Sequence, residues 1–149
     1  MSFTATQLIP VIPEIFITFM IVIVMLADLF LNERLRNQST FLLTQLTLVV
    51  CSVLSVNLFH HQTQIVFHNS FIVDHMACVL KVFIYATTFL SLLYSHTYIH
   101  QKHLAEGQVY LVTLFVVVGM MVLVSAYSFI TLFIGLELLS LPLYAMIAM

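Results

Sequence analysis

Charged residues are scarce in this 149-residue chain. Lys and Arg together number four and Asp and Glu six, so charged residues make up 7% of the sequence, whereas hydrophobic residues make up 62%. Water-soluble domains typically contain about 25% charged residues. Together with the mean hydropathy of +1.15, this composition predicts a polytopic membrane protein with the lipid bilayer as its surroundings. The net charge of −2 argues against nucleic acid as a partner.

Glycine, proline and cysteine are also few. Three Gly and three Pro leave little room for loops or linkers, so we expect one transmembrane helical bundle over residues 1–149. The apolar surroundings of Cys51 and Cys78 favour two buried thiols over a disulfide. Residues 1–13 contain no Lys or Arg. A cleaved signal peptide needs a basic n-region, so we expect the first apolar segment to be retained.

Five apolar runs are long enough to cross a membrane. A helix needs about 20 residues to span the hydrocarbon core. The runs predict helices over residues 8–31, 41–59, 75–98, 108–126 and 128–149, and thus an all-α integral membrane protein. Residues 60–74 are too short and too polar to span. There, the apolar triplets 65–67 and 71–73 flank His68–Asn69–Ser70, a pattern that predicts a small hairpin at the membrane interface.

The basic residues predict the orientation of the bundle. Arg34, Arg36 and Lys102 all fall in the connections after the first and third predicted helices. Connections rich in Lys and Arg face the cytoplasm. We therefore expect these two connections to be cytoplasmic and the N-terminus to be periplasmic.

One carboxylate, Glu137, lies near the middle of the uncharged run 128–149. At about 1.5 Å per residue it lies about 14 Å beyond Ser128, close to mid-bilayer. An ionised carboxylate there costs roughly 2.5–3.5 kcal/mol, so we interpret Glu137 as a functional proton site. The alternative is a protonated Glu that only hydrogen-bonds a neighbouring helix. Ser140 and Tyr144 share its helical face, and Pro142 predicts a kink just beyond it.

Three other charged residues fall within or at the ends of the predicted spans. We expect Glu14 to lie at the interface, in the first turn of its helix, where the helix dipole stabilises a carboxylate. Asp28 is expected to reach the headgroups or to pair with Arg34 or Arg36. For Lys81 we expect either a side chain that extends to the surface or a structural pair with Asp74 or another buried acid. A transport role for Lys81 is the less favoured alternative.

The histidines raise the question of a metal site. His96, His100 and His103 follow i, i+4, i+7 spacing, which places three potential ligands on one helical face. They fall where the third helix leaves the membrane, so we favour interfacial polar residues over metal ligands. The sequence has no phosphate loop, dinucleotide fingerprint, cysteine cluster or haem-attachment motif. We therefore expect the chain to bind no cofactor and to perform no redox chemistry itself.

Several segments resemble one membrane-protein family. The run GLELLSLPLY at residues 135–144 is the most specific, and residues 106–115, 118–121 and 129–144 extend the similarity. The segments LIPVIPEIF at 8–16 and DHMACVLK at 74–81 fit more loosely. Together these residues are similar to the antiporter-like membrane subunits of respiratory complex I, and among them to the subunit N family of bacterial NADH–quinone oxidoreductases, the counterpart of mitochondrial NADH dehydrogenase subunit 2.

The resemblance implies both a fold and a function. The fold would be the N-terminal portion of an antiporter-like subunit. The function would be that of a non-redox subunit that contributes to proton translocation coupled to quinone reduction, in the bacterial inner membrane. Glu137 would be the fifth-helix glutamate of a proton half-channel. NADH, quinone, FMN and iron–sulfur clusters would be bound elsewhere in the complex, whose other membrane subunits would be partners.

The resemblance also implies a missing partner for Glu137. In the family this glutamate pairs with a lysine two helices later, on a segment absent from these 149 residues. We therefore expect the remainder of the subunit as a partner and no proton pumping by this chain alone. Two alternatives stay open: a subunit of a multisubunit cation/proton antiporter, and a non-catalytic membrane scaffold.

Overall fold

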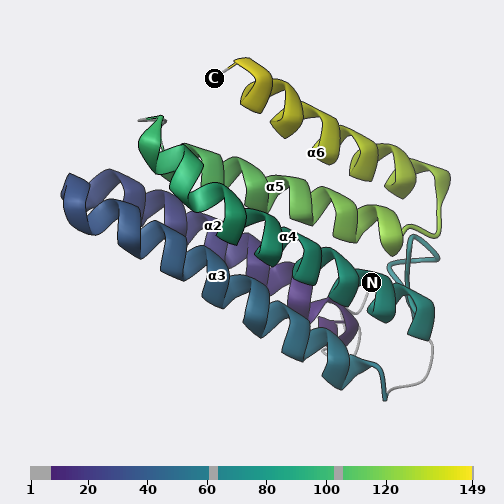
Figure 1. Ribbon diagram of the computed structural model, residues 1–149. Helices are drawn as coiled ribbons and strands as arrows, with labels where there is room; N and C mark the ends of the chain where they lie inside the picture. The colour runs from purple at the N-terminus through teal and green to yellow at the C-terminus, as the bar shows by residue number, and fades with distance from the viewer. Residues whose placement is uncertain (1–7, 61–63, 103–105, 149) are drawn as a thin grey trace.

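Five long helices run side by side in the computed structural model, which describes residues 8–60, 64–102 and 106–148 (Figure 1). Each is long and apolar enough to cross a membrane. They are α2 (Ile12–Phe30), α3 (Glu33–Leu58), α4 (His75–Gln101), α5 (Glu106–Val124) and α6 (Phe129–Ala148), and a short 3-10 turn, η1 (Ile9–Val11), precedes α2. The chain is a multi-pass helical membrane protein, as its composition predicted.

The observed helices extend beyond several of the predicted bounds. Helix α3 begins at Glu33, whereas the sequence predicted a start at residue 41, and α4 continues to Gln101 instead of ending at 98. The apolar runs mark only the part of each helix that crosses the hydrocarbon. Residues 33–40 lack Gly and Pro and include several good helix formers, so the helix continues into the polar region.

The predicted hairpin is present between α3 and α4. Strand β1 (Gln64–Val66) pairs with β2 (Phe71–Val73) in antiparallel register, with Ile65 opposite Ile72. The turn holds three consecutive non-glycine residues with φ between 54° and 64°: Phe67, His68 and Asn69. Such left-handed backbone costs roughly 1–2 kcal/mol per residue and persists only where the surroundings hold it.

The hairpin is bonded to the connection between α5 and α6. The backbone N–H of Ile72 donates to the carbonyl oxygen of Ser125 at 2.9 Å, and that of Tyr127 donates to the carbonyl of Ser70 at 3.1 Å. Phe71 and Ala126 form the bridge between these two bonds. The hairpin is therefore hydrogen-bonded to the segment that leads into α6.

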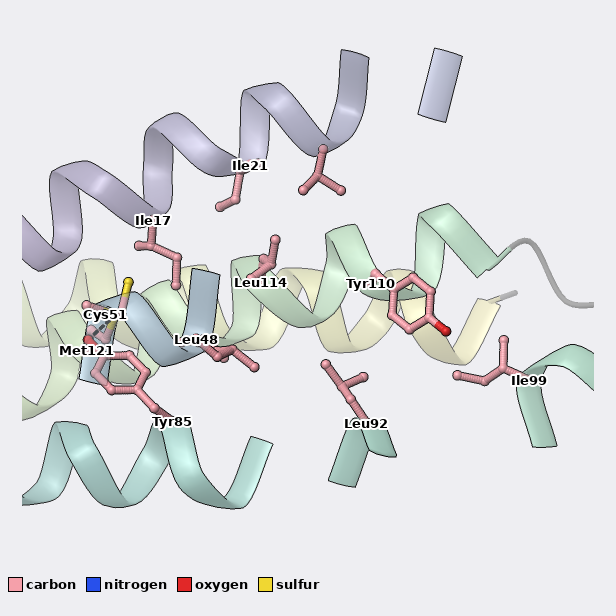
Figure 2. Packing of buried hydrophobic residues seen from close by; sticks show 12 residues of the cluster. Ile17, Ile21, Leu48, Cys51, Tyr85, Leu92, Ile99, Tyr110, Leu114 and Met121 are labelled. Atoms are coloured by element: carbon pink, nitrogen blue, oxygen red, sulfur yellow. Dashed lines mark hydrogen bonds between the residues drawn. The ribbon is translucent and has the colours of Figure 1, made fainter. Parts of the chain in front are cut away.

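The hydrophobic core lies among α2, α3, α4 and α5. Figure 2 shows Ile17, Leu48 and Leu114 converging on its centre, and all three are essentially inaccessible to solvent. Helix α6 lies outside this core and packs along α5 (Figure 1). Among the described residues of α6 only Gly135 is buried. One face of α6 is thus exposed within the part of the chain that the structure describes.

Candidate intramembrane proton site

Glu137 lies on α6 and is exposed. It comes eight residues after Phe129, the first residue of α6, which places it about 12 Å along the helix. The opposite face of α6 is the one that packs on α5, because a Cβ atom added at Gly135 would lie 3.0 Å from Leu123. The glutamate is therefore held at membrane depth on a face that the described residues leave uncovered.

The neighbours of Glu137 differ in part from the expectation. Ser140 does lie beside it, but its hydroxyl donates to the backbone carbonyl oxygen of Glu137, at 3.4 Å, and not to the carboxylate. Tyr144 is exposed on the same side of the helix. Helix α6 continues through Pro142 to Ala148. Within residues 8–60, 64–102 and 106–148, the Glu137 carboxylate has no ion-pair partner.

Glu14 lies in the first turn of its helix, as predicted, but its side chain is buried within the bundle. Its carboxylate pairs with the ammonium group of Lys81, and the two residues are 7% and 2% exposed. Lys81 therefore does not extend to the surface. The prediction of a pair with a buried acid is confirmed for Lys81, and the acid is Glu14. Sequence reasoning missed the combination because the residues are 67 positions apart, although each is a charge inside an apolar segment.

Two buried hydrogen bonds involve residues close to this ion pair along its helices, Pro13 beside Glu14 and Tyr85 one turn beyond Lys81. The Sγ of Cys51 donates to the carbonyl oxygen of Pro13 at 3.8 Å, and the hydroxyl of Tyr85 donates to the sulfur of Met121 at 3.3 Å (Figure 2). Lys81 also lies 5.2 Å from the ring centre of Phe71. Removing one partner of a buried ion pair typically costs about 3–5 kcal/mol, since the remaining charge is left uncompensated.

Asp74, the other acid considered for Lys81, has a different role. It caps the N-terminus of α4, where its side chain accepts a hydrogen bond from the backbone N–H of Ala77 at 2.7 Å. A carboxylate at this position satisfies one of the free amide donors of the first helical turn. Asp74 therefore fixes the start of the helix that carries Lys81.

The opposite end of the bundle gathers further titratable side chains. Asp28 pairs with Arg36 at 3.5 Å, which is one of the two partners expected for it. Glu106 is buried, and His100 Nδ1 lies 2.8 Å from one of its oxygens. His96 Nδ1 lies 2.9 Å from the hydroxyl of Tyr110.

These contacts give His96 and His100 separate partners. The third histidine of the i, i+4, i+7 set, His103, lies outside the described residues. Among the residues that the structure places, no three potential metal ligands come together.

The chain is similar in sequence to curated proteins along its whole length. No family model matches the chain. Curated relatives do match: NADH-quinone oxidoreductase subunit N of Ruthia magnifica subsp. Calyptogena magnifica is 45% identical over 99% of the chain, and that of Nitrosomonas europaea is 43% identical over the whole chain. The subunit N of Thioalkalivibrio sulfidiphilus is 40% identical over 99%.

The chain spans only about 30% of the length of these relatives. The similarity nevertheless covers all five helices and the hairpin, because it extends over essentially the whole chain. The resemblance indicated by the residues is confirmed: this chain is similar, from end to end, to a part of NADH-quinone oxidoreductase subunit N.

Proposed function

We propose that the chain forms part of the membrane arm of a bacterial NADH–quinone oxidoreductase and that Glu137 binds a proton during translocation. The observation that carries the proposal is the place of Glu137 at membrane depth on the open face of α6. Ionisable residues inside membrane spans are costly, and they usually mark ion or proton pathways. The similarity to subunit N over the whole chain supports this assignment.

An uncovered carboxylate at this depth needs a partner. Charged groups in spanning helices face a protein interior or a water-filled cavity, not lipid. Further helices of the same subunit would cover the Glu137 face, and the resemblance assigns one of them a lysine. Approach of that cation favours the ionised carboxylate, and its withdrawal favours the protonated one, so movement of the lysine would drive proton uptake and release.

The chain's own contribution is then proton handling within a larger enzyme. Its partners would be the rest of its subunit and the other membrane subunits of the complex. NADH, FMN, iron–sulfur clusters and quinone would be bound by those other parts. The basic residues Arg34, Arg36 and Lys102 would lie on the cytoplasmic side of the inner membrane and the hairpin on the periplasmic side.

The test is Glu137→Gln in the assembled complex, which removes the titratable group and keeps the shape of the side chain. Proton movement into membrane vesicles, measured per NADH oxidised, is expected to fall severely while assembly is retained. Glu33→Gln is the matched control, because Glu33 is an exposed carboxylate at a helix end. Wild-type proton movement in Glu137→Gln would contradict the proposal, and loss of assembly would favour the scaffold.

A further inference from the structure

The Glu14–Lys81 pair lies in the bundle core and is not part of the Glu137 site. It joins α2 to α4 near the end of the bundle that carries the hairpin, since Glu14 is in the first turn of α2 and Lys81 is six residues into α4. One carboxylate oxygen of Glu14, Oε2, is buried without a hydrogen-bond partner among the described residues. The Glu14 carboxylate is therefore held by its contact with the Lys81 ammonium group.

A second group holding the Lys81 ammonium is the ring of Phe71. The ammonium nitrogen lies 5.2 Å from the ring centre, within the range of a cation–π contact, which is strongest where water is excluded. Both side chains are buried, at 2% and 7% exposure. Lys81 thus connects the carboxylate of α2 to strand β2 of the hairpin.

Strand β2 in turn holds the start of the helix that carries Glu137. Phe71 forms a bridge with Ala126, and the backbone bonds from Ile72 to Ser125 and from Tyr127 to Ser70 lie on either side of it. Phe129, the first residue of α6, follows two residues after Tyr127. A continuous series of contacts therefore runs from Glu14 through Lys81, Phe71 and the residues 125–127 to α6.

We propose that the Glu14–Lys81 pair positions α6, and with it Glu137, by holding Phe71 and the hairpin against the connection between α5 and α6. Glu14, Lys81 and Phe71 are positioning residues and make no contact with the proton that Glu137 binds. This inference rests on the proposed role of Glu137. Its physical basis is that α6 has few other constraints: its packing within the described residues is mainly against α5, and Gly135 is its one buried residue there.

The variant that isolates this connection is Phe71→Leu. Leucine keeps an apolar side chain in the core and leaves the Glu14–Lys81 pair intact, but it removes the aromatic ring. Tyr85→Phe is the matched control, because it also removes a buried polar contact of α4, to Met121 on α5, without touching the hairpin. Glu14→Gln is the second variant and breaks the pair itself.

Two measurements on the assembled complex are needed. The first is hydrogen–deuterium exchange of the peptides that contain the Ile72 and Tyr127 amides. Exchange in Phe71→Leu is expected to be roughly thirtyfold faster than in the wild type, the factor that corresponds to losing a desolvated cation–π contact. The second is proton movement per NADH oxidised, which is expected to fall by at least roughly twofold, the lower end of the range for a residue that modulates coupling without contacting the ligand.

The outcomes separate this inference from the proposed function. Faster exchange together with reduced proton movement in Phe71→Leu, and neither in Tyr85→Phe, supports the positioning role. Wild-type exchange or wild-type proton movement in Phe71→Leu overturns it, whether or not Glu14→Gln assembles. If Glu137→Gln pumps protons normally, the proposed function fails first and the positioning role fails with it. If Glu137→Gln is inactive and Phe71→Leu is normal, the positioning role alone is wrong.

Discussion

Gly119 of α5 lies directly against the backbone of Leu139 in α6. A Cβ atom at Gly119 would come within 2.7 Å of the Leu139 nitrogen and 2.9 Å of the Leu138 carbonyl carbon. Backbone atoms cannot move aside as a flexible side chain can. The absence of a side chain at Gly119 therefore sets how closely the two helices approach, only two residues from Glu137.

We predict that Gly119→Ala separates α6 from α5. Overpacking of a close contact typically costs about 1–3 kcal/mol, and the intrinsic gain of alanine over glycine in a helix, about 1 kcal/mol, offsets only part of this cost. The expected result is a lower unfolding temperature of the subunit in mild detergent. Gly135→Ala is the comparison variant: its Cβ would meet the Leu123 side chain and backbone nitrogen at 3.0 Å, so a smaller effect is expected. Equal stability of Gly119→Ala and wild type would contradict the close contact.

For the buried ion pair we predict strong non-additivity. Lys81→Met or Glu14→Leu alone leaves one unpaired charge in the core, at a cost of about 3–5 kcal/mol. The double variant has no buried charge, and apolar replacements of buried ion pairs are often neutral or stabilising. Thermal unfolding of the three variants forms a double-mutant cycle. A double variant as unstable as the sum of the two single ones would show that the charges do not interact.

The turn of the hairpin gives a prediction about backbone strain. His68 is exposed and has a φ of 54°, a conformation that glycine adopts without the Cβ clash. His68→Gly is expected to stabilise the folded chain by about 1 kcal/mol, the lower end of the left-handed penalty. His68→Ala keeps the Cβ atom and serves as the control for loss of the imidazole. An unfolding temperature no higher in the glycine variant than in the alanine variant would contradict the prediction.

At the other end of the bundle, Asp28 and Gly107 are packed against each other. A Cβ atom at Gly107 would lie 1.8 Å from the Asp28 Oδ1 atom, which also faces Arg36. Gly107→Ala is therefore expected to displace the Asp28 carboxylate and to destabilise the bundle by about 1–3 kcal/mol.

The second variant for this contact is Asp28→Ala/Gly107→Ala, in which the clash is absent. We expect the added cost of Gly107→Ala to disappear in the Asp28→Ala background, and unfolding temperatures measure this. The same cost in both backgrounds would rule out the contact as its cause.

The spanning helices and the hairpin could be predicted from local sequence. Apolar runs of about 20 residues are needed to cross a bilayer, whatever they pack against. The hairpin could be recognised because the apolar triplets 65–67 and 71–73 lie on either side of a polar turn. Helices α3 and α4 were predicted too short, because an apolar run ends where the helix leaves the hydrocarbon. The helix itself continues for as long as its backbone hydrogen bonds do. Glu137 stood out for a similar local reason, as a single charge in an uncharged run.

The tertiary structure alone decided which charges meet. Glu14 and Asp74 are both acids near the same end of the bundle, and the sequence analysis named only Asp74, beside an unspecified buried acid, as a partner of Lys81. The fold turns Glu14 toward Lys81 and uses Asp74 as a helix cap.

By itself the sequence determined that this chain spans the membrane and carries an acid at Glu137, since an apolar run of about 20 residues and a single charge within it can be recognised without knowing what packs against them. The tertiary structure decided that Glu14 is paired, because pairing depends on the rotation of each helix about its axis, and that rotation is set by packing across the whole bundle.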